Sequence, residues 1–336
     1  MLARSDQLQA FRSDYLNLII LPTEACNFRC TYCYETFENK KMSRRVVTGI
    51  KSLIDRRGTE LDELEISWFG GEPLLAFDVV TDICKHAIGA AKAGGFNFSS
   101  NMTTNGYFLD RQCFLSCLAN GIGSFQISLD GGPNDHNTSR KLASGAGTFD
   151  RIWANLLAMK EVPGEFTILL RLHYTYENFM SVGRFARRIG EALGGDTRFH
   201  CFFRNIARLG GANDESIKLF SENDRKEIEA YLWQTSGLHQ TPDPAPAEHY
   251  VCYAAKGNSL VVRSTGRLAK CTVALESDFN DIGSIKEDGD IWVDQAKFRR
   301  WITPVLEGHW EEVACPLSWV AQRAEHDGAS STAVGA

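Results

Sequence analysis

The chain lacks a long hydrophobic run, a strongly basic region and a targeting segment at its start. None of its apolar stretches reaches the roughly 18 residues that a membrane-spanning helix needs. The net charge of -6 and the pI near 5.8 argue against a surface that binds nucleic acid through clustered lysine and arginine. The opening residues also lack the basic, apolar and small-residue regions of a signal peptide. We therefore expect a cytoplasmic protein with reduced thiols, no membrane and no nucleic-acid partner.

Three of the ten cysteines stand close together, at Cys26, Cys30 and Cys33. Thiolates on such short loop spacings bind the irons of iron-sulfur clusters, so this run can hold three irons of a 4Fe-4S cluster and leave the fourth open. Zinc sites usually show paired C-x2-C or histidine partners, which this asymmetric spacing does not offer. A disulfide or buried core thiols would also account for three cysteines. The spacing favours the cluster.

Strand-like and helix-like segments alternate along the first two thirds of the chain. An apolar run at 15–22 leads directly into the cysteines, and residues 46–54 then carry apolar side chains on one stripe of a helical period. The alternation continues with strands expected at 64–69, 96–103, 124–129, 166–174 and 199–203. Strands joined by helical crossovers run parallel. The pattern predicts an α/β fold, either an open doubly wound sheet or a full or partial barrel.

The loop after the second expected strand reads Gly70-Gly71-Glu72-Pro73. Glycines let a backbone approach a ligand closely, and a carboxylate accepts hydrogen bonds from an ammonium group. A turn with a solvated glutamate is the plainer interpretation.

Polar side chains also follow the third and fourth strands, at Asn105, Ser128 and Asp130. They suit ribose or carboxylate binding and are also ordinary turn chemistry. Arg171 interrupts an apolar strand and points a cation toward the barrel interior or its rim.

Taken together, these motifs resemble the radical SAM superfamily, whose enzymes cleave S-adenosylmethionine (SAM) at a 4Fe-4S cluster with one open iron. The resemblance implies a partial (β/α)6 barrel with the cluster loop after the first strand. It implies that Tyr32 lies against the adenine of SAM and that Gly70, Gly71 and Glu72 hold its amino group. Asn105, Ser128 and Asp130 would contact SAM and substrate. For Arg171, the SAM carboxylate and a structural salt bridge are both open.

A proline-rich stretch at 241–248 precedes a second group of cysteines, Cys252, Cys271 and Cys315. A β-hairpin is expected over 261–273, with its turn at residues 264–266. This region resembles the SPASM and Twitch extensions, in which a hairpin presents cysteines to an auxiliary 4Fe-4S cluster. We expect a radical SAM core at 1–240, a small SPASM/Twitch-like iron-sulfur domain at 241–324 and a disordered tail at 325–336.

The second group departs from the SPASM pattern. A full SPASM domain has seven cysteines and two clusters, whereas three cysteines remain here after residue 250. One auxiliary cluster is therefore expected, although buried free thiols would also fit. The candidates for its fourth ligand are His249, His309, Glu311, a more distant residue, or none.

The other four cysteines, Cys84, Cys113, Cys117 and Cys201, are expected in the core. No catalytic base is assigned. In sulfatase maturases an aspartate that takes a proton follows the hairpin cysteine, and here Thr272 stands there. Asp278 and Asp281 are candidates by nearness alone.

The motifs as a whole most resemble peptide-modifying maturases. The resemblance implies a radical SAM oxidoreductase in which a 5'-deoxyadenosyl radical abstracts hydrogen and a ribosomally synthesised peptide is oxidised or crosslinked. It also implies an electron donor such as flavodoxin or ferredoxin, and an auxiliary cluster that accepts an electron from the substrate or binds it. A small-molecule, aminocyclitol-like dehydrogenase is the second candidate enzyme, and a non-catalytic iron-sulfur redox protein is a candidate of a different class. Because the first strand begins near residue 15, we expect no leader-binding domain before it.

Overall fold

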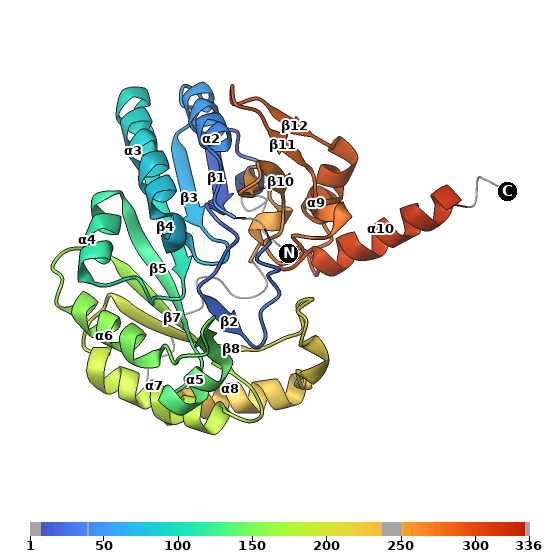
Figure 1. The fold of residues 1–336 in the computed structure, drawn as a ribbon. Helices are drawn as coiled ribbons and strands as arrows, with labels where there is room; N and C mark the ends of the chain where they lie inside the picture. The colour runs from blue at the N-terminus through green and yellow to red at the C-terminus, as the bar shows by residue number, and fades with distance from the viewer. Residues whose placement is uncertain (1–7, 39, 237–249, 333–336) are drawn as a thin grey trace.

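A computed structural model describes residues 8–38, 40–236 and 250–332 (Figure 1). The expected linker, the expected domain boundary and His249 lie outside these residues. A ten-stranded sheet runs through the described part in the order β12-β11-β10-β9-β1-β3-β4-β5-β7-β8. Within that part the sheet is open, because β12 and β8 stand at its two ends. The predicted α/β partial barrel is confirmed.

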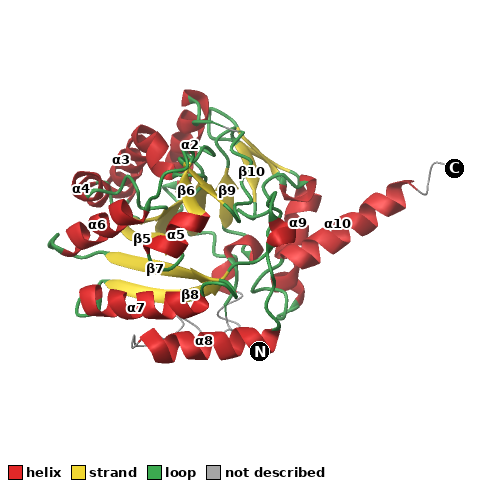
Figure 2. Ribbon diagram, turned by 60° about the horizontal axis from the view of Figure 1, so that its bottom comes forward, coloured by secondary structure: helices red, strands yellow, loops and turns green. Residues whose placement is uncertain are grey.

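Six parallel strands joined by helical crossovers form the barrel, and each lies within about two residues of its predicted position. They are β1 (Tyr15–Ile20), β3 (Glu63–Trp68), β4 (Asn97–Thr104), β5 (Ile122–Leu129), β7 (Thr167–Tyr174) and β8 (Phe199–Asn205). Helices cover the outer face of this sheet (Figures 1 and 2). They are α2 (Arg44–Arg57), α3 (Phe77–Gly94), α4 (Arg111–Ala119), α6 (Phe149–Lys160), α7 (Phe179–Leu193) and α8 (Glu222–Ser236).

The two faces of the barrel strands differ in polarity. On β3, Leu64, Ile66 and Trp68 are fully buried under the helices, whereas Glu65 and Ser67 alternate with them on the inner face. The inner face is polar and hollow, with a cavity of about 390 Å³ lined by side chains such as Glu65. Every second side chain of β3, here Glu65 and Ser67, therefore faces the barrel interior and not the core.

The C-terminal strands continue the barrel sheet and do not form a separate one. Strand β9 (Ser259–Val262) pairs in parallel with β1, and β10 (Arg267–Ala269) pairs antiparallel with β9. This confirms the predicted hairpin and its turn. Strands β11 (Gly283–Ile285) and β12 (Ile291–Val293) complete the edge, beside α9 (Gln295–Glu307) (Figure 1).

A buried ion pair fastens this hairpin to the segment that leads from β1 into the first cysteines. Arg263 donates to Glu24 through Nη2 at 2.6 Å and through Nε at 3.3 Å. The backbone N–H and the hydroxyl of Ser264 donate to the same carboxylate. Arg263 also binds the carbonyl of Leu275 and the half-exposed Glu276. The pair joins residues 239 positions apart in the sequence.

Several short elements escaped sequence-based prediction. Strand β2 (Phe28–Cys30) lies inside the cysteine loop and pairs antiparallel with β6 (Arg140–Leu142), which follows α5 (Pro133–Ser139). The 3-10 turns are η1 (Pro73–Ala76), η2 (Asp214–Ser216), η3 (Tyr253–Ala255) and η4 (Asp278–Asn280).

The last helix, α10 (Leu317–Thr332), projects from the body of the molecule (Figure 1). It continues to Thr332 through a stretch that contains no proline, which differs from the disordered tail expected at 325–336. Across the described ranges, no helix is both long enough and apolar enough to cross a membrane.

Candidate functional site

The two glycines after β3 bring that loop into contact with the chain that enters the first cysteine group. A Cβ at Gly70 would collide with the carbonyl oxygen of Thr23, and one at Gly71 with that of Ala25. Gly70 also has a positive φ of 115°, which only glycine adopts readily. The backbone N–H of Glu72 donates to the Ala25 carbonyl at 2.9 Å. The close approach that glycine permits is thus made to the cysteine loop itself.

The side chain of Glu72 faces the protein interior. Its carboxylate is fully buried and accepts hydrogen bonds from the Thr104 hydroxyl and the Asn105 backbone N–H, both at 2.8 Å, and from the Leu74 N–H at 3.1 Å. Burial raises the pKa of Glu72, and these hydrogen bonds oppose the rise. The carboxylate therefore ties the loop after β3 to the loop after β4.

One pocket at the upper ends of the barrel strands gathers most of the residues predicted to bind a cofactor. It is lined by all three cysteines of the first group and by Tyr32, Gly70, Gly71, Asn105, Ser128 and Arg171. Glu72 and Asp130 lie behind this lining and are fully buried. The structure therefore brings all eight predicted residues to one place, with two of them as supports of the wall.

Backbone N–H groups point at the sulfur atoms of the first cysteine group. The N–H of Phe28 donates to Cys26 Sγ at 3.3 Å, and that of Glu35 donates to Cys33. The side-chain amide of Asn105 lies 3.9 Å from Cys26 Sγ and donates to Asn27 at 2.8 Å. Hydrogen bonds of this kind stabilise thiolate sulfur in iron-sulfur sites. The donor set fits a 4Fe-4S cluster.

Burial opposes ionisation of these thiols in the chain alone. It raises the pKa of Cys26 to about 12 and that of Cys33 to about 11, and it also raises the pKa of Cys30. The thiols are therefore protonated at neutral pH until a metal displaces their protons.

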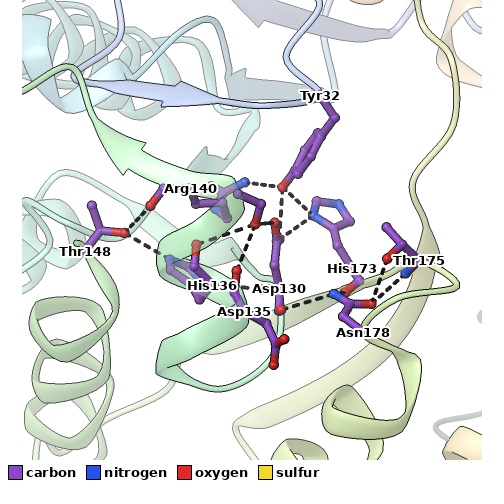
Figure 3. A network of polar contacts seen from close by, with 10 residues as sticks. Tyr32, Asp130, Asp135, His136, Arg140, Thr148, His173, Thr175 and Asn178 are labelled. Atoms are coloured by element: carbon purple, nitrogen blue, oxygen red, sulfur yellow. Dashed lines mark hydrogen bonds and ion pairs between the residues drawn. The ribbon is translucent and has the colours of Figure 1, made fainter. Parts of the chain in front are cut away.

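A network of polar contacts holds Tyr32 at the pocket wall (Figure 3). Its hydroxyl donates to Asp130 Oδ1 at 2.9 Å, lies 3.0 Å from His173 Nδ1 and accepts from Arg140 Nη1 at 2.8 Å. His173 Nδ1 lies 3.1 Å from the same Asp130 oxygen, and Ser139 donates to the other. The tyrosine hydroxyl is thus held by three side chains.

Burial and neighbouring charges decide which groups of this network are ionised. Burial lowers the pKa of His173 to about 4 and that of His136 to about 3, although Asp130 acts in the opposite direction on both. Burial also acts to raise the pKa of Asp130, but the hydrogen bond from His173 and the Arg140 charge bring it well below its usual range. At neutral pH the network therefore holds an aspartate anion, an arginine cation and neutral histidines.

Arg171 faces the pocket from β7 without an acidic partner in the described residues. Its Nε is buried and has no hydrogen-bond partner there, and its pKa is lowered by burial and by the neighbouring Arg204, which also lines the pocket. Two guanidinium groups without a carboxylate make this wall attractive to an anion.

The second cysteine group also comes together. Cys252 leads into η3, Cys271 follows β10 and Cys315 precedes α10. The backbone N–H groups of Ala254 and Val273 donate to Cys252 and Cys271. Burial raises the pKa of Cys252 to about 11, and the other two cysteines add to the rise, so the three lie within electrostatic reach of one another.

Tyr34 lies within electrostatic reach of both cysteine groups. Burial raises its pKa well above the usual value, and Glu35, Tyr253, Cys33 and Cys271 contribute to that rise. One tyrosine therefore lies close to a member of each group.

The candidate fourth ligands and bases have other partners. His309 packs against Trp319 at 4.4 Å between ring centroids and lies 3.3 Å from Glu307. Asp278 binds Lys297, and Asp281 binds Arg267, both as ion pairs. Glu311 joins no cluster of metal-ligating side chains within the described ranges.

The other four cysteines make no hydrogen bond of the type made by the two groups. The free thiols of Cys84, Cys117 and Cys201 are buried. Cys113 is partly buried and hydrogen-bonded to the thiol of Cys117. In the part of the chain that the structure describes, no three histidine, cysteine or acidic side chains stand close enough to hold one metal ion directly.

Five further residues line the pocket although no role was predicted for them from the sequence: Tyr34, Glu35, Arg140, His173 and Arg204. Burial raises the pKa of Glu35 to about 7, and nearby Glu24 adds to the rise. A signal existed for Arg140, because it lies ten residues after Asp130, one of the residues that carried the resemblance to the family. The others reach the pocket only through tertiary packing.

Comparison with protein families matches residues 20–186 to the radical SAM superfamily. A cysteine-type anaerobic sulfatase-maturating enzyme of Clostridium perfringens is 27% identical over 46% of this chain and 43% of its own length. A GTP 3',8-cyclase of Tolumonas auensis is 35% identical over 35% of this chain and 33% of its own length. The chain thus spans less than half the length of these curated relatives.

Solved structures share the fold over a longer range. The structure of anSMEcpe with bound AdoMet and Kp18Cys peptide superposes with a TM-score of 0.64 at 18% identity, covering 85% of this chain and 81% of that one. Streptococcus suis SuiB bound to precursor peptide SuiA gives a TM-score of 0.59 at 15% identity, covering 85% and 66%. At these identities the likeness establishes the fold.

Proposed function

Residues 20–186 of this chain belong to the radical SAM superfamily, and from that premise we propose that the protein oxidises or crosslinks a ribosomally synthesised peptide. One observation carries the proposal. Four of the six cysteines in the two groups accept a hydrogen bond from the backbone N–H two residues ahead, at Phe28, Glu35, Ala254 and Val273. The four cysteines outside the two groups accept no such hydrogen bond; they are Cys84, Cys113, Cys117 and Cys201. This contrast supports Cys26 and Cys33 as ligands of a SAM-binding 4Fe-4S cluster, and the shared pocket lining adds Cys30.

When bound, that cluster and SAM supply a 5'-deoxyadenosyl radical that removes a hydrogen atom from the substrate. The residues of the chain shape the place where this occurs. Gly70 and Gly71 present backbone atoms to the pocket, Tyr32 forms the wall beside the cysteines, and Arg171 offers its cation to the SAM carboxylate. Ser128 adds a hydroxyl to the lining, and Asn105 holds the cysteine loop through Asn27.

For Glu72 and Asp130 we propose supporting roles. Their carboxylates are engaged by the loop after β4 and by the Tyr32 network, so they fix the pocket wall. The implied contact of the Glu72 carboxylate with the SAM amino group stays a prediction.

Cys252, Cys271 and Cys315 are proposed as ligands of one auxiliary cluster. They lie near one another, two of them accept backbone hydrogen bonds, and Tyr34 lies within electrostatic reach of Cys271 and of Cys33 in the first group. The peptide substrate rests on relatives of similar fold whose structures contain bound peptides. Thr272 in place of an aspartate argues against formylglycine as the product.

The test uses the full chain reconstituted anaerobically with iron and sulfide. With dithionite and SAM, the wild type should form 5'-deoxyadenosine. The triple variant Cys26→Ala, Cys30→Ala, Cys33→Ala should form none but keep about half of the iron, since one of two clusters remains. Absence of 5'-deoxyadenosine from the wild type would contradict the enzyme, and an iron-free triple variant would contradict the auxiliary cluster.

A matched control is the double variant Cys113→Ser, Cys117→Ser. It removes two core thiols and should keep both the iron and the SAM cleavage. For the substrate, a peptide encoded beside the gene should lose hydrogen in the mass spectrum after incubation with enzyme and SAM. An unchanged peptide, with a neighbouring sugar pathway whose product is oxidised, would favour the small-molecule dehydrogenase.

A further inference from the structure

Arg140 occupies an unusual position beside the first cysteine group. It opens β6 and pairs directly with Cys30 of β2 across the two-stranded ribbon. Its residue is only 7% exposed, and it lines the pocket that holds the cysteines. A cation is therefore buried next to three thiols.

No carboxylate pairs directly with Arg140 in the described residues, and the Asp130 anion acts on its charge across the Tyr32 hydroxyl. Nη1 donates to the neutral hydroxyl of Tyr32 at 2.8 Å, and the guanidinium lies 5.6 Å from the ring of Phe28. Its Nε is buried and has no partner in the described residues, where no carboxylate forms an ion pair with it. Asp130 is the acid closest in the network, but its oxygens are engaged by Tyr32, His173 and Ser139 (Figure 3).

Burial of a cation is costly unless an anion accompanies it. A cluster held by three thiolates brings negative charge into the pocket, and its reduction adds more. A fixed cation beside it stabilises the reduced form over the oxidised form, because charge and hydrogen bonding around a cluster set its potential. Since this argument needs Cys26, Cys30 and Cys33 to hold a cluster, it rests on the proposed function.

We propose that Arg140 is the fixed counter-cation of the cluster at Cys26, Cys30 and Cys33 and that it raises the reduction potential of that cluster. Arg140 is then a tuning and positioning residue. Its contact with Tyr32 couples the same cation to the pocket wall. A purely structural role would instead act through that contact alone.

The two roles are separated by four variants of the full-length chain. Arg140→Met removes the charge, and Arg140→Lys keeps it without the planar fork. Tyr32→Phe removes the hydrogen bond but leaves the cation. Lys141→Met is the matched control, because Lys141 is the next residue of the same ribbon and its side chain is exposed.

The readout is a potentiometric titration followed by electron paramagnetic resonance, using the signal that changes when SAM is added. At a fixed solution potential, Arg140→Met should lower the ratio of reduced to oxidised cluster about tenfold, which is about 59 mV for a one-electron couple. Arg140→Lys, Tyr32→Phe and Lys141→Met should stay within about threefold of the wild type. An unchanged ratio in Arg140→Met, or an equal loss in Tyr32→Phe, would overturn the proposal.

Thermal unfolding of the iron-free chain provides a second measurement in case Arg140→Met does not retain iron. Without a cluster Arg140 keeps only its hydrogen bond to Tyr32 and the attraction of Asp130, so Arg140→Met should lower the melting temperature no more than Tyr32→Phe does. A clearly larger loss in Arg140→Met than in Tyr32→Phe would show that Arg140 is structural and would refute the assignment. A wild type that binds no iron would refute the proposed function, which the melting comparison does not require.

Discussion

The Glu24–Arg263 ion pair yields a prediction whose size follows from the structure. Both side chains are almost fully buried, with exposures of 3% and 8%. Removing one member of a buried pair typically costs about 3–5 kcal/mol, because the other charge loses its compensation. For Glu24→Gln we expect the lower part of this range, since Arg263 keeps Glu276 and the Leu275 carbonyl. For Arg263→Met we expect the upper part.

These energies convert into a measurable change in melting temperature. The unfolding entropy of about 2.1 cal/mol/K per residue gives about 0.7 kcal/mol/K for a chain of this length. Glu24→Gln should therefore melt about 4 °C lower and Arg263→Met about 7 °C lower. Because one sheet spans both parts of the chain, we expect a single transition.

The assay is thermal unfolding of the iron-free chain by circular dichroism at neutral pH, with both single variants and the double variant. The double variant should lose less than the sum of the single losses by about 1–3 kcal/mol, the usual coupling of contacting residues. Glu276→Gln serves as the control and should cost at most about 1 kcal/mol, because Glu276 is half exposed. Additive losses, or a Glu24→Gln variant that melts like the wild type, would refute the reasoning.

Three further predictions concern the site. The folded-state pKa of His173 is near 4 and that of His136 near 3, whereas an unfolded histidine titrates near 6.5. The free energy of unfolding should therefore fall as the pH drops from 6.5 to 4, by up to about 1.4 kcal/mol per pH unit for each of the two histidines. Urea unfolding at stepped pH measures this slope, and a flat profile would contradict it. Gly71→Ala should reduce iron retention because its Cβ collides with the cysteine loop, whereas Gly89→Ala, with open space around its Cβ, should be neutral; colorimetric iron assay compares them. Glu72→Ala should destabilise by about 2–4 kcal/mol because it leaves buried donors unsatisfied; equal melting temperatures of variant and wild type would exclude this role.

Sequence reasoning located the barrel strands because their pattern is local. Leu64, Ile66 and Trp68 alternate with polar residues within six positions, and helices with a clear apolar stripe separate such runs. The three-residue strands β2 and β6 have no periodic pattern, and their pairing joins residues more than 100 positions apart. Arg140 could therefore not be placed beside Cys30 from the sequence.

The site shows the same division. The resemblance to the radical SAM superfamily implied one shared site for Tyr32, Gly70, Gly71 and Arg171, and in the structure all four line one pocket. It could not show which side chains face that pocket and which are turned away from it. The orientation of a carboxylate such as that of Glu72 depends on the donors that neighbouring loops offer, and these are set by tertiary contacts.

The position of β1 in the sheet has a consequence for how the molecule is made. One edge of β1 pairs with β3, whose partner residues lie 48 positions later, whereas the other edge pairs with β9, whose partner residues lie 242 positions later. During synthesis on the ribosome that second edge stays unpaired until almost four fifths of the chain has emerged. An unpaired strand edge is a template for association with other chains. A truncated protein that ends before β9 should therefore aggregate during production, and the hairpin of β9 and β10 acts as the closing partner of β1.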